Sequence, residues 1–306
     1  MGSLDGRVAI VTGAAQGLGA AEAVALAANG ARVVLNDLPG PHLDEVADRI
    51  KTAGGEATVH PGDVGDWSTG EALVKAATDT FGGLDILVNN AGVLRDRMVF
   101  SMSEQEWDTV VRVHLRGHFV TTRFATAYWR DRSKADGRPP YARIINTASE
   151  AFLLGSAGQP NYAAAKGGIV ALTLATARGC AKYGVRANAI CPRARTAMTG
   201  DLMGPPPDGP DPMAPERVTP LVTYLAGPAA ARITGEVFVV HGDVVAVLGP
   251  PTVRAAFHAV SGRWSLTELD AALSTVFTDD PPRPGFVCED TLPLAASTFG
   301  ETSRDA

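Results

Sequence analysis

At 306 residues the chain exceeds the usual length of a single domain, although one α/β domain can reach about 250 residues. Its 45% hydrophobic content is enough for a large core, and its formal net charge of −6 excludes a general nucleic-acid binder, which is normally basic. Three widely spaced cysteines and six unclustered histidines predict neither a disulfide framework nor a metal site.

The sequence also predicts a location. The N-terminus reaches the first apolar β run within seven residues and contains no signal-peptide core. No apolar run approaches the roughly 20 residues of a membrane span. The final residues, Ser303–Ala306, do not form the Ser-Lys-Leu peroxisomal signal. We therefore expect a cytoplasmic protein with no membrane partner.

Buried β runs alternate with helical segments along the chain. We expect strands at 7–12, 31–36, 56–60, 84–89, 142–147, 185–191 and 236–240. We expect helices at 18–29, 41–53, 68–81, 103–130, 161–183 and 215–226, and an exposed loop at 131–140. This alternation predicts a Rossmann-like, doubly wound α/β fold, with a seven-stranded parallel sheet and helices on both faces.

A glycine-rich turn joins the first strand to the first helix. It contains Gly13, Gln16, Gly17, Leu18 and Gly19 in the spacing Gly-x-x-x-Gly-x-Gly. In this strand–turn–helix context, glycines let backbone N–H groups approach a pyrophosphate at the helix N-terminus. A tight βα connection without a ligand is the alternative interpretation.

The second strand ends at an acidic residue, Asp37. A carboxylate there can accept hydrogen bonds from both adenosine ribose hydroxyls, and it repels the 2′-phosphate of NADP. No Lys or Arg stands in the glycine-rich turn or beside Asp37 to offset that repulsion. The sequence therefore predicts NAD as cofactor, with NADP less favoured. The alternative is that Asp37 merely begins a turn before Pro39.

Tyr162 and Lys166 stand four residues apart, so on a helix they share one face. A neutral-pH acid/base needs the phenol pKa lowered by roughly 3 units from about 10, or about 4 kcal/mol. A neighbouring ammonium supplies that shift, and Ser149, thirteen residues earlier, can hold a substrate oxygen. An ordinary surface helix is the alternative for the Tyr-x-x-x-Lys pattern alone.

The chemistry-bearing residues share one position relative to the predicted strands. Each lies at or just after a carboxyl end: Gly13, Asp37, Asp63, Asn90, Ser149 and Pro192. Open α/β sheets bind ligands outside those ends, so we expect one composite site.

Together these motifs resemble the short-chain dehydrogenase/reductase family over residues 6 to about 248. The resemblance implies three catalytic residues, Ser149, Tyr162 and Lys166. It implies that Asp63 and Val64 flank the adenine. The cofactor-binding set that it implies is Gly13, Gln16, Gly17, Leu18, Gly19, Asp37, Asp63, Val64, Asn90, Ala91, Gly92, Tyr162, Lys166, Pro192 and Thr196.

Three short segments, 36–40, 93–98 and 113–117, resemble the dehydrogenase part of the peroxisomal multifunctional enzymes of type 2 and their bacterial stand-alone relatives. That group implies oxidation of (3R)-hydroxyacyl-CoA with NAD. Three alternatives stay open: a 17β-hydroxysteroid dehydrogenase, a 3-oxoacyl carrier-protein reductase, and a non-catalytic NAD-sensing module.

Two positions depart from the family pattern. Most members carry Asn where this chain has His114, and there the Asn organises a water that relays protons from the lysine. The type 2 group resembles this chain in having His. His114 therefore either joins the relay or makes only a local backbone contact. Arg193 stands where many members have Gly.

Two segments lie outside the strand–helix alternation. The proline-rich residues 199–215 predict a short, stiff lid, with a disordered surface loop as the alternative. Beyond the dehydrogenase domain at 1–248, residues 249–306 form an extension. It is weakly helical at 252–261, and Ser265 and Glu268 resemble a capping box before a helix at 269–277. By resemblance, the extension packs on the substrate rim or on a dimer partner.

Large aromatic side chains predict a subunit contact. The helix expected at 103–130 carries Phe119, Phe124, Tyr128 and Trp129. Such a set is too apolar for a solvated face. In the family that the chain resembles, the corresponding helices pack across a two-fold axis, so we expect a homodimer or homotetramer. Burial within the subunit is the alternative.

Overall fold

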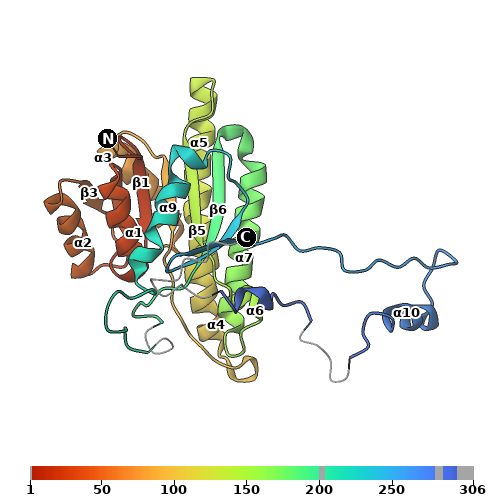
Figure 1. The fold of residues 1–306 in the computed structure, drawn as a ribbon. Coiled ribbons are helices and arrows are strands. Elements are labelled where there is room, and N and C mark those ends of the chain that lie inside the picture. The colour runs from red at the N-terminus through yellow and green to blue at the C-terminus, as the bar shows by residue number, and fades with distance from the viewer. Residues whose placement is uncertain (1, 200–203, 280–284, 295–306) are drawn as a thin grey trace, which may run out of the picture.

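The structure is a computed structural model that describes residues 2–199, 204–279 and 285–294. Its centre is one eight-stranded sheet in the order β3-β2-β1-β4-β5-β6-β7-β8 (Figure 1). The strands are β1 Val8–Thr12, β2 Arg32–Asn36, β3 Glu56–Val59, β4 Ile86–Asn89, β5 Ala142–Thr147, β6 Val185–Pro192, β7 Val237–His241 and β8 Val244–Val247. The order reverses beside β1, as in a doubly wound fold, so the predicted fold class is confirmed.

The eighth strand was not predicted from the sequence. β1 to β7 pair in parallel, whereas β8 pairs antiparallel with β7. Gly242 and Asp243 form a two-residue turn between His241 and Val244, and Gly242 has a φ of +55°. A Gly-Asp pair between two valine-rich runs is a hairpin signal, so the sequence did contain the information.

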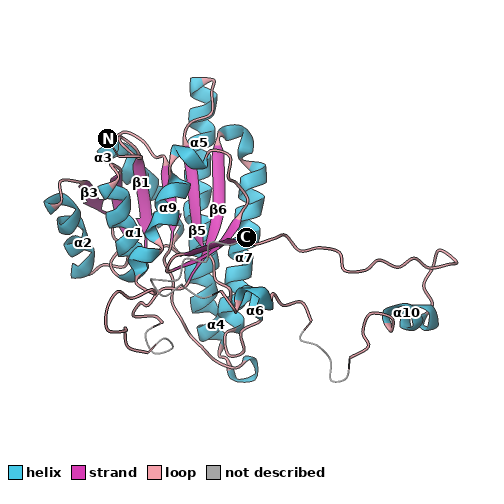
Figure 2. Cartoon of the chain, viewed as in Figure 1, coloured by secondary structure: helices cyan, strands magenta, loops and turns pink. Residues whose placement is uncertain are grey.

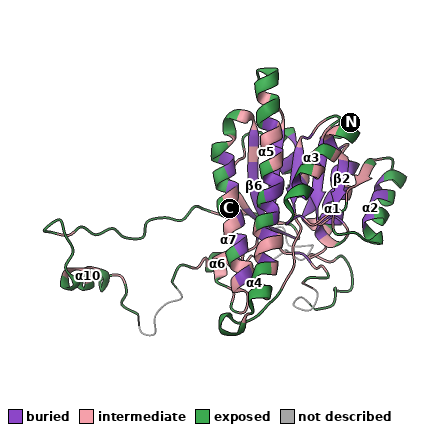
Figure 3. Cartoon of the chain, turned by 180° about the vertical axis from the view of Figure 1, so that it is seen from behind, coloured by how far each residue is buried: buried purple, intermediate pink, exposed green. Residues whose placement is uncertain are grey.

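Helices cover both faces of the sheet (Figure 2). One face packs against α1 (Gly17–Ala28), α2 (Pro41–Thr52) and α9 (Thr219–Ala226). The other packs against α3 (Trp67–Phe81), α5 (Gly117–Asp136) and α7 (Pro160–Gly179). The buried residues form continuous layers along the strands between these helices (Figure 3). The strands are therefore apolar on both sides, as expected of a parallel sheet.

The predicted helix at 103–130 is longer and less regular than expected. It consists of α4 (Glu104–Val111), a π-helical turn η2 (Arg112–Arg116) and α5. The loop predicted at 131–140 was wrong for its first six residues, because α5 continues to Asp136. Arg132 and Asp136, one turn apart, form an ion pair of 2.9 Å that supports an exposed helix, and Gly137 ends it at a φ of +66°.

The aromatic side chains of this helix are mostly covered within the subunit. Trp129 is fully buried and donates its indole N–H to the Leu84 carbonyl at 2.7 Å. Phe124 packs edge-on against Trp67, with ring centroids 5.1 Å apart. Phe119 remains 43% exposed. Intrasubunit packing therefore explains most of the aromatic row that the sequence analysis assigned to a partner.

The extension leaves the body and then returns to it. Ser265 and Glu268 form the predicted capping box, and α10 spans Leu266–Leu273, so it begins and ends earlier than the predicted 269–277. No helix forms at 252–261, so that expectation was wrong. Figures 1 and 3 both show α10 apart from the sheet. Residues 285–294 lie on the body, where the Cys288 amide donates to the Leu153 carbonyl of α6 (Ala151–Leu154) at 3.1 Å.

Within the described ranges, no helix has the length and apolarity to cross a membrane. The same residues contain no cluster of three or more His, Cys, Asp or Glu side chains suited to a metal ion.

Candidate active site

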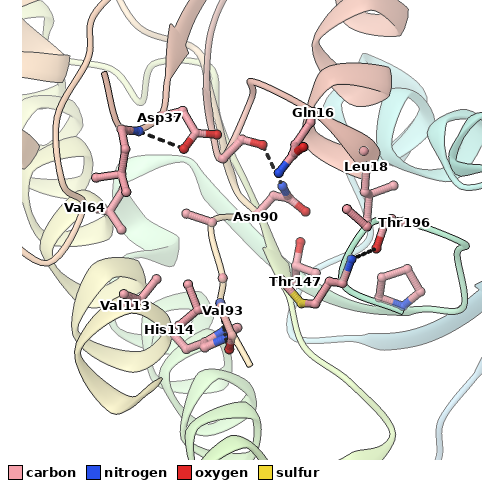
Figure 4. A pocket seen from close by; sticks show the side chains of 18 of the residues that line it. Gln16, Leu18, Asp37, Val64, Asn90, Val93, Val113, His114, Thr147 and Thr196 are labelled. Carbon is pink, nitrogen blue, oxygen red and sulfur yellow. Dashed lines mark hydrogen bonds between the residues drawn. The ribbon is translucent and has the colours of Figure 1, made fainter. Parts of the chain in front are cut away.

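A cavity of about 260 Å³ lies at the carboxyl ends of the parallel strands, and its lining comes from the loops after β1, β2, β3, β4, β5 and β6 (Figure 4). The sequence-predicted site residues meet here, and all but Gly19 and Ser149 line the cavity. Sequence reasoning missed several lining residues: Asn36, Leu38, Gly62, Val93, Val113, Thr147, Ala148, Ala194, Ala197, Met198 and Thr199. Most of them are small or apolar. Asn36, Leu38, Val93 and Val113 lie in the segments 36–40, 93–98 and 113–117, and Thr199 begins the predicted lid, so their positions beside motif residues were the available signal.

The glycine-rich turn is packed too closely for side chains. Gly13 has a φ of +67°, a conformation that favours glycine. A Cβ on Gly19 would overlap the Gly13 carbonyl oxygen and would lie 2.5 Å from the Asn90 side-chain nitrogen. Asn90 in turn donates to the carbonyls of Thr12 and Gly13 at 3.3 Å. The turn is thus locked onto the loop after β4, with the N-terminus of α1 facing the cavity.

Asp37 closes one end of the cavity. Its Oδ2 accepts the Ala15 amide of the glycine-rich turn at 3.0 Å, and its Oδ1 accepts the Leu38 amide at 2.8 Å. A carboxylate has about four lone-pair sites, so it can accept two more hydrogen bonds from a ligand. Among the described residues that line this cavity, Lys166 is the single lysine and there is no arginine.

Asp63 and Val64 are on the loop after β3 and line the same cavity as Asp37, which follows β2. Arg112 of η2 bonds the Asp63 carboxylate at 2.5 Å and also reaches Asp66 at 2.6 Å. The second Asp63 oxygen accepts the Gly65 amide at 2.7 Å. These contacts fix the Asp63 carboxylate at the cavity wall and leave the apolar Val64, which is buried, beside it.

Ser149, Tyr162 and Lys166 come together at the ends of β5 and α7. Ser149 lies near Tyr162, and its hydroxyl acts to lower the Tyr162 pKa. Lys166, 2% exposed, donates from Nζ to the Thr147 carbonyl at 2.6 Å. The same Nζ lies 5.3 Å from the Tyr162 ring centroid. A substrate oxygen beside Tyr162 would therefore meet two hydroxyl groups backed by one buried cation.

Burial controls the titration of this cluster. It raises the pKa of Tyr162 to about 12, against the opposing effect of the Ser149 hydrogen bond. Burial also lowers the pKa of Lys166 to about 7. The expectation that Lys166 brings the Tyr162 pKa below 10 was wrong for the protein without cofactor. Desolvation of a phenol in an apolar site outweighs an ammonium that lies over the ring rather than at the hydroxyl.

His114 stands in the π-helical turn η2, a kind of turn frequent at functional sites. Its Nε2 lies 3.0 Å from the Val93 amide nitrogen and 2.8 Å from the Val93 carbonyl oxygen, so the tautomer decides which one it bonds. The ring packs edge-on against Tyr162 at 5.2 Å, and a Cβ on Gly92 would overlap it. Burial and the nearby Lys166 hold the His114 pKa well below 6.5, so the imidazole is neutral.

The backbone contact expected as one alternative for His114 is present, and the relay role stays a prediction. Nδ1 of His114 and Oγ1 of Thr147 are buried and have no hydrogen-bond partner within the described part of the chain. His118, one turn later, is also buried, and sequence reasoning missed it. Burial and the charge on Lys166 lower its pKa to about 3. Buried polar atoms of this kind normally bind ordered water.

Pro192 and Thr196 line the cavity beyond β6, and Arg195 precedes Thr196 in the chain. Thr196 lies across from the glycine-rich turn, 3.3 Å from where a Gly17 Cβ would be. Arg195 binds the proline-rich segment: its Nε donates to Asp211 at 2.8 Å, and its amide donates to the Met213 carbonyl at 2.6 Å. Part of the predicted lid, 200–203, lies outside the described residues. The lid role stays a prediction.

Comparison with known proteins adds three findings. The family model described as short chain dehydrogenase matches residues 7–203. The hydroxyacyl-CoA dehydrogenase ChsB1 of Mycobacterium tuberculosis is 49% identical over 299 residues, which are 94% of this chain and 94% of that protein. A crystal structure of a short chain dehydrogenase from Mycobacterium avium is 45% identical, with a TM-score of 0.82, and covers 92% of this chain and 98% of that one.

Longer relatives share only their dehydrogenase region with this chain. The peroxisomal multifunctional enzyme type 2 of Mus musculus is 42% identical over 230 residues, which are 72% of this chain but 30% of that enzyme. The match therefore spans less than a third of the multifunctional protein.

Proposed function

This chain belongs to the short-chain dehydrogenase family, and from that premise we propose that it oxidises (3R)-hydroxyacyl-CoA to 3-oxoacyl-CoA with NAD as hydride acceptor. The observation that carries the proposal is the convergence of Ser149, Tyr162 and Lys166 beside a glycine-rich nucleotide turn, in a chain 49% identical to a hydroxyacyl-CoA dehydrogenase over nearly its whole length. As a family member, the protein is an oxidoreductase that acts on CH–OH groups and uses a nicotinamide cofactor.

The residues of the cavity fit such a cofactor. The turn at Gly13 and Gly19 leaves no room for side chains, and it leads into the N-terminus of α1, where a pyrophosphate is favoured. Asp37 retains lone pairs for ribose hydroxyls. We assign the adenine flank to Asp63 and Val64 and the nicotinamide border to Pro192 and Thr196. When bound, the nicotinamide supplies the hydride acceptor.

The chain's own residues then perform the proton chemistry. Ser149 holds the C3 oxygen of the substrate by a hydrogen bond. Tyr162, as phenolate, removes the hydroxyl proton while the C3–H bond gives up its hydride and the C3=O bond forms. Protonated Lys166 favours that phenolate, as an oxidised nicotinamide ring would when bound, and both oppose the burial that raises the Tyr162 pKa. Lys166 and the neutral His114 then return the proton to solvent through water.

The substrate assay tests this function directly. NADH formation is measured with matched (3R)- and (3S)-hydroxyacyl-CoA, with 17β-estradiol, and with NADP in place of NAD. Rapid oxidation of the (3R) ester with NAD is expected. Turnover of the steroid alone would move the assignment to hydroxysteroids, a preference for NADPH-driven reduction would favour a carrier-protein reductase, and NAD binding without any turnover would favour a sensor.

We propose NAD rather than NADP because of Asp37, and substitution of this residue provides the test. In Asp37→Ala the ribose loses charge-assisted hydrogen bonds of about 1.5–3 kcal/mol each, so the KM for NAD should rise roughly tenfold or more. The KM for NADP should fall, because the repulsion of its 2′-phosphate is removed. Asp44→Ala, an exposed carboxylate on α2, is the charge-matched control. Unchanged selectivity between the two cofactors would refute the assignment.

We also propose that the protein is cytoplasmic and forms a homodimer or homotetramer, and that 249–306 is an extension of a dehydrogenase domain at 1–248. Exposed apolar side chains on α5, β8 and the extension support the assembly, notably Phe119, Val247 and Phe277, which are 43%, 62% and 69% exposed. Sedimentation as a monomer at micromolar concentration would overturn the proposed assembly.

A further inference from the structure

A partly buried ion pair joins the two loops that border the reacting end of the cavity. Arg193 follows Pro192 at the end of β6, and Glu150 follows Ser149 after β5. Nε and Nη2 of Arg193 bond the two Glu150 carboxylate oxygens at 2.7 and 2.9 Å, a bidentate arrangement. The side chains are only 21% and 12% exposed. Arg193 is not among the residues that line the cavity, and its guanidinium is directed to Glu150 and to residues 291 and 294.

The same arginine binds the end of the described extension. Its Nη1 donates to the Leu294 carbonyl and its Nη2 to the Thr291 carbonyl, both at 2.5 Å. Thr291 is 2% exposed, and Leu294 packs on the small core cluster that contains Ala148 and Cys191. With the bond between the Cys288 amide and the Leu153 carbonyl, residues 288–294 are fixed to the loop that follows Ser149.

The charges of Arg193 and Glu150 compensate each other. Burial acts to raise the pKa of Glu150, but the hydrogen bonds from Arg193 and Thr291 outweigh it, so that pKa lies below its usual value. The pair is therefore ionised at neutral pH. Removal of one partner would leave the other charge in a poorly solvated position, which is strongly unfavourable. The loop conformation therefore depends on both residues together.

We propose that Arg193 and Glu150 are positioning residues that, through an ion pair shared with residues 288–294, hold Ser149 in the geometry that hydride transfer requires. This inference rests on the proposed function for its kinetic consequence. The ion pair would act by placing Ser149, which precedes Glu150 directly in the chain and accepts the Ala151 amide at 3.2 Å within the same loop. A displacement of about 1 Å at a reacting group can cost on the order of a hundredfold in rate.

The test compares Arg193→Ala, Arg193→Lys and the control Arg132→Ala, which removes an exposed arginine of α5 that also has an ion pair. We expect Arg193→Ala to lower kcat roughly tenfold or more, to increase the primary deuterium isotope effect on kcat from a C3-deuterated substrate, and to leave NAD affinity within about twofold. Arg193→Lys should recover part of kcat, because lysine keeps the charge but not the bidentate geometry.

Hydrogen exchange of the same variants provides a measurement without turnover. Arg193→Ala should speed amide exchange in both 288–294 and 149–153, whereas Arg132→Ala should change neither. Glu150→Gln removes the charge with little change in shape. It should also lower kcat and speed exchange in both segments, so it provides the test if Arg193→Ala is poorly folded. Unchanged exchange at 149–153 together with unchanged kcat would overturn the proposal. Failure of the wild type to oxidise any hydroxyacyl-CoA would overturn the proposed function alone, since exchange at 149–153 would still measure the positioning.

Discussion

Replacement of Tyr162 with phenylalanine is expected to reduce hydroxyacyl-CoA oxidation at least about a thousandfold, within the range for loss of a general acid/base group. Phenylalanine keeps the buried ring and its edge-on contact with His114. It removes the hydroxyl whose phenolate form takes the substrate proton. The loss should therefore appear in kcat, while NAD binding stays nearly unchanged.

Steady-state kinetics measures kcat, and a fluorescence titration with NAD measures the affinity for the cofactor. Tyr224→Phe, a hydroxyl removal at a tyrosine that is 47% exposed on α9, is the matched control and should behave as wild type. Turnover of Tyr162→Phe at the wild-type rate would show that another group takes the proton, and the neutral His114 would then be the first residue to test.

Replacement of Glu22 with glutamine should give the largest change in stability, and the change should grow with pH. Glu22 is fully buried in the alanine-rich α1, and neither carboxylate oxygen has a hydrogen-bond partner in the described structure. Burial raises its pKa to about 8 from 4.5. The stability that protonated Glu22 contributes is thus fully present below pH 4.5 and is lost as the pH rises through 8. At about 1.4 kcal/mol per unit, this loss is at most on the order of 5 kcal/mol.

Urea unfolding at pH 5 and at pH 8.5 measures the effect. The wild type should lose stability between these two values, and Glu22→Gln, which cannot ionise, should lose much less. Glu71→Gln, an exposed carboxylate on α3, is the control and should follow the wild type. A constant difference between Glu22→Gln and wild type across this range would mean that Glu22 does not titrate there.

The sequence predicted the features that depend on local pattern. Strand ends and the glycine-rich turn follow from short apolar runs and from residues such as Gly13, whose backbone conformation few other residues adopt. Because parallel strands end at one edge of the sheet, the order of strands and helices along the chain was enough to place Asp37 and Tyr162 in a common site.

The remaining features depend on contacts that sequence patterns do not encode. Whether Lys166 lowers or fails to lower the Tyr162 pKa depends on desolvation, a property of the folded surroundings. His118 belongs to no motif, and only the fold shows that its side chain is buried near Lys166. Arg193 was visible as a departure from the family pattern, but its partners lie 43 residues earlier and about a hundred residues later in the chain.

The π-helical turn at 112–116 sets the rotational phase of the long helix that contains it. Such a turn holds one residue more than an α-helical turn, so the side chains of α5 are rotated about the helix relative to those of α4. His114 can therefore face the Tyr162 ring while Trp129, four turns further on, faces the sheet. Because of the extra residue, the part of the helix before α5 can direct a side chain to the active site while α5 directs its apolar side chains to the core.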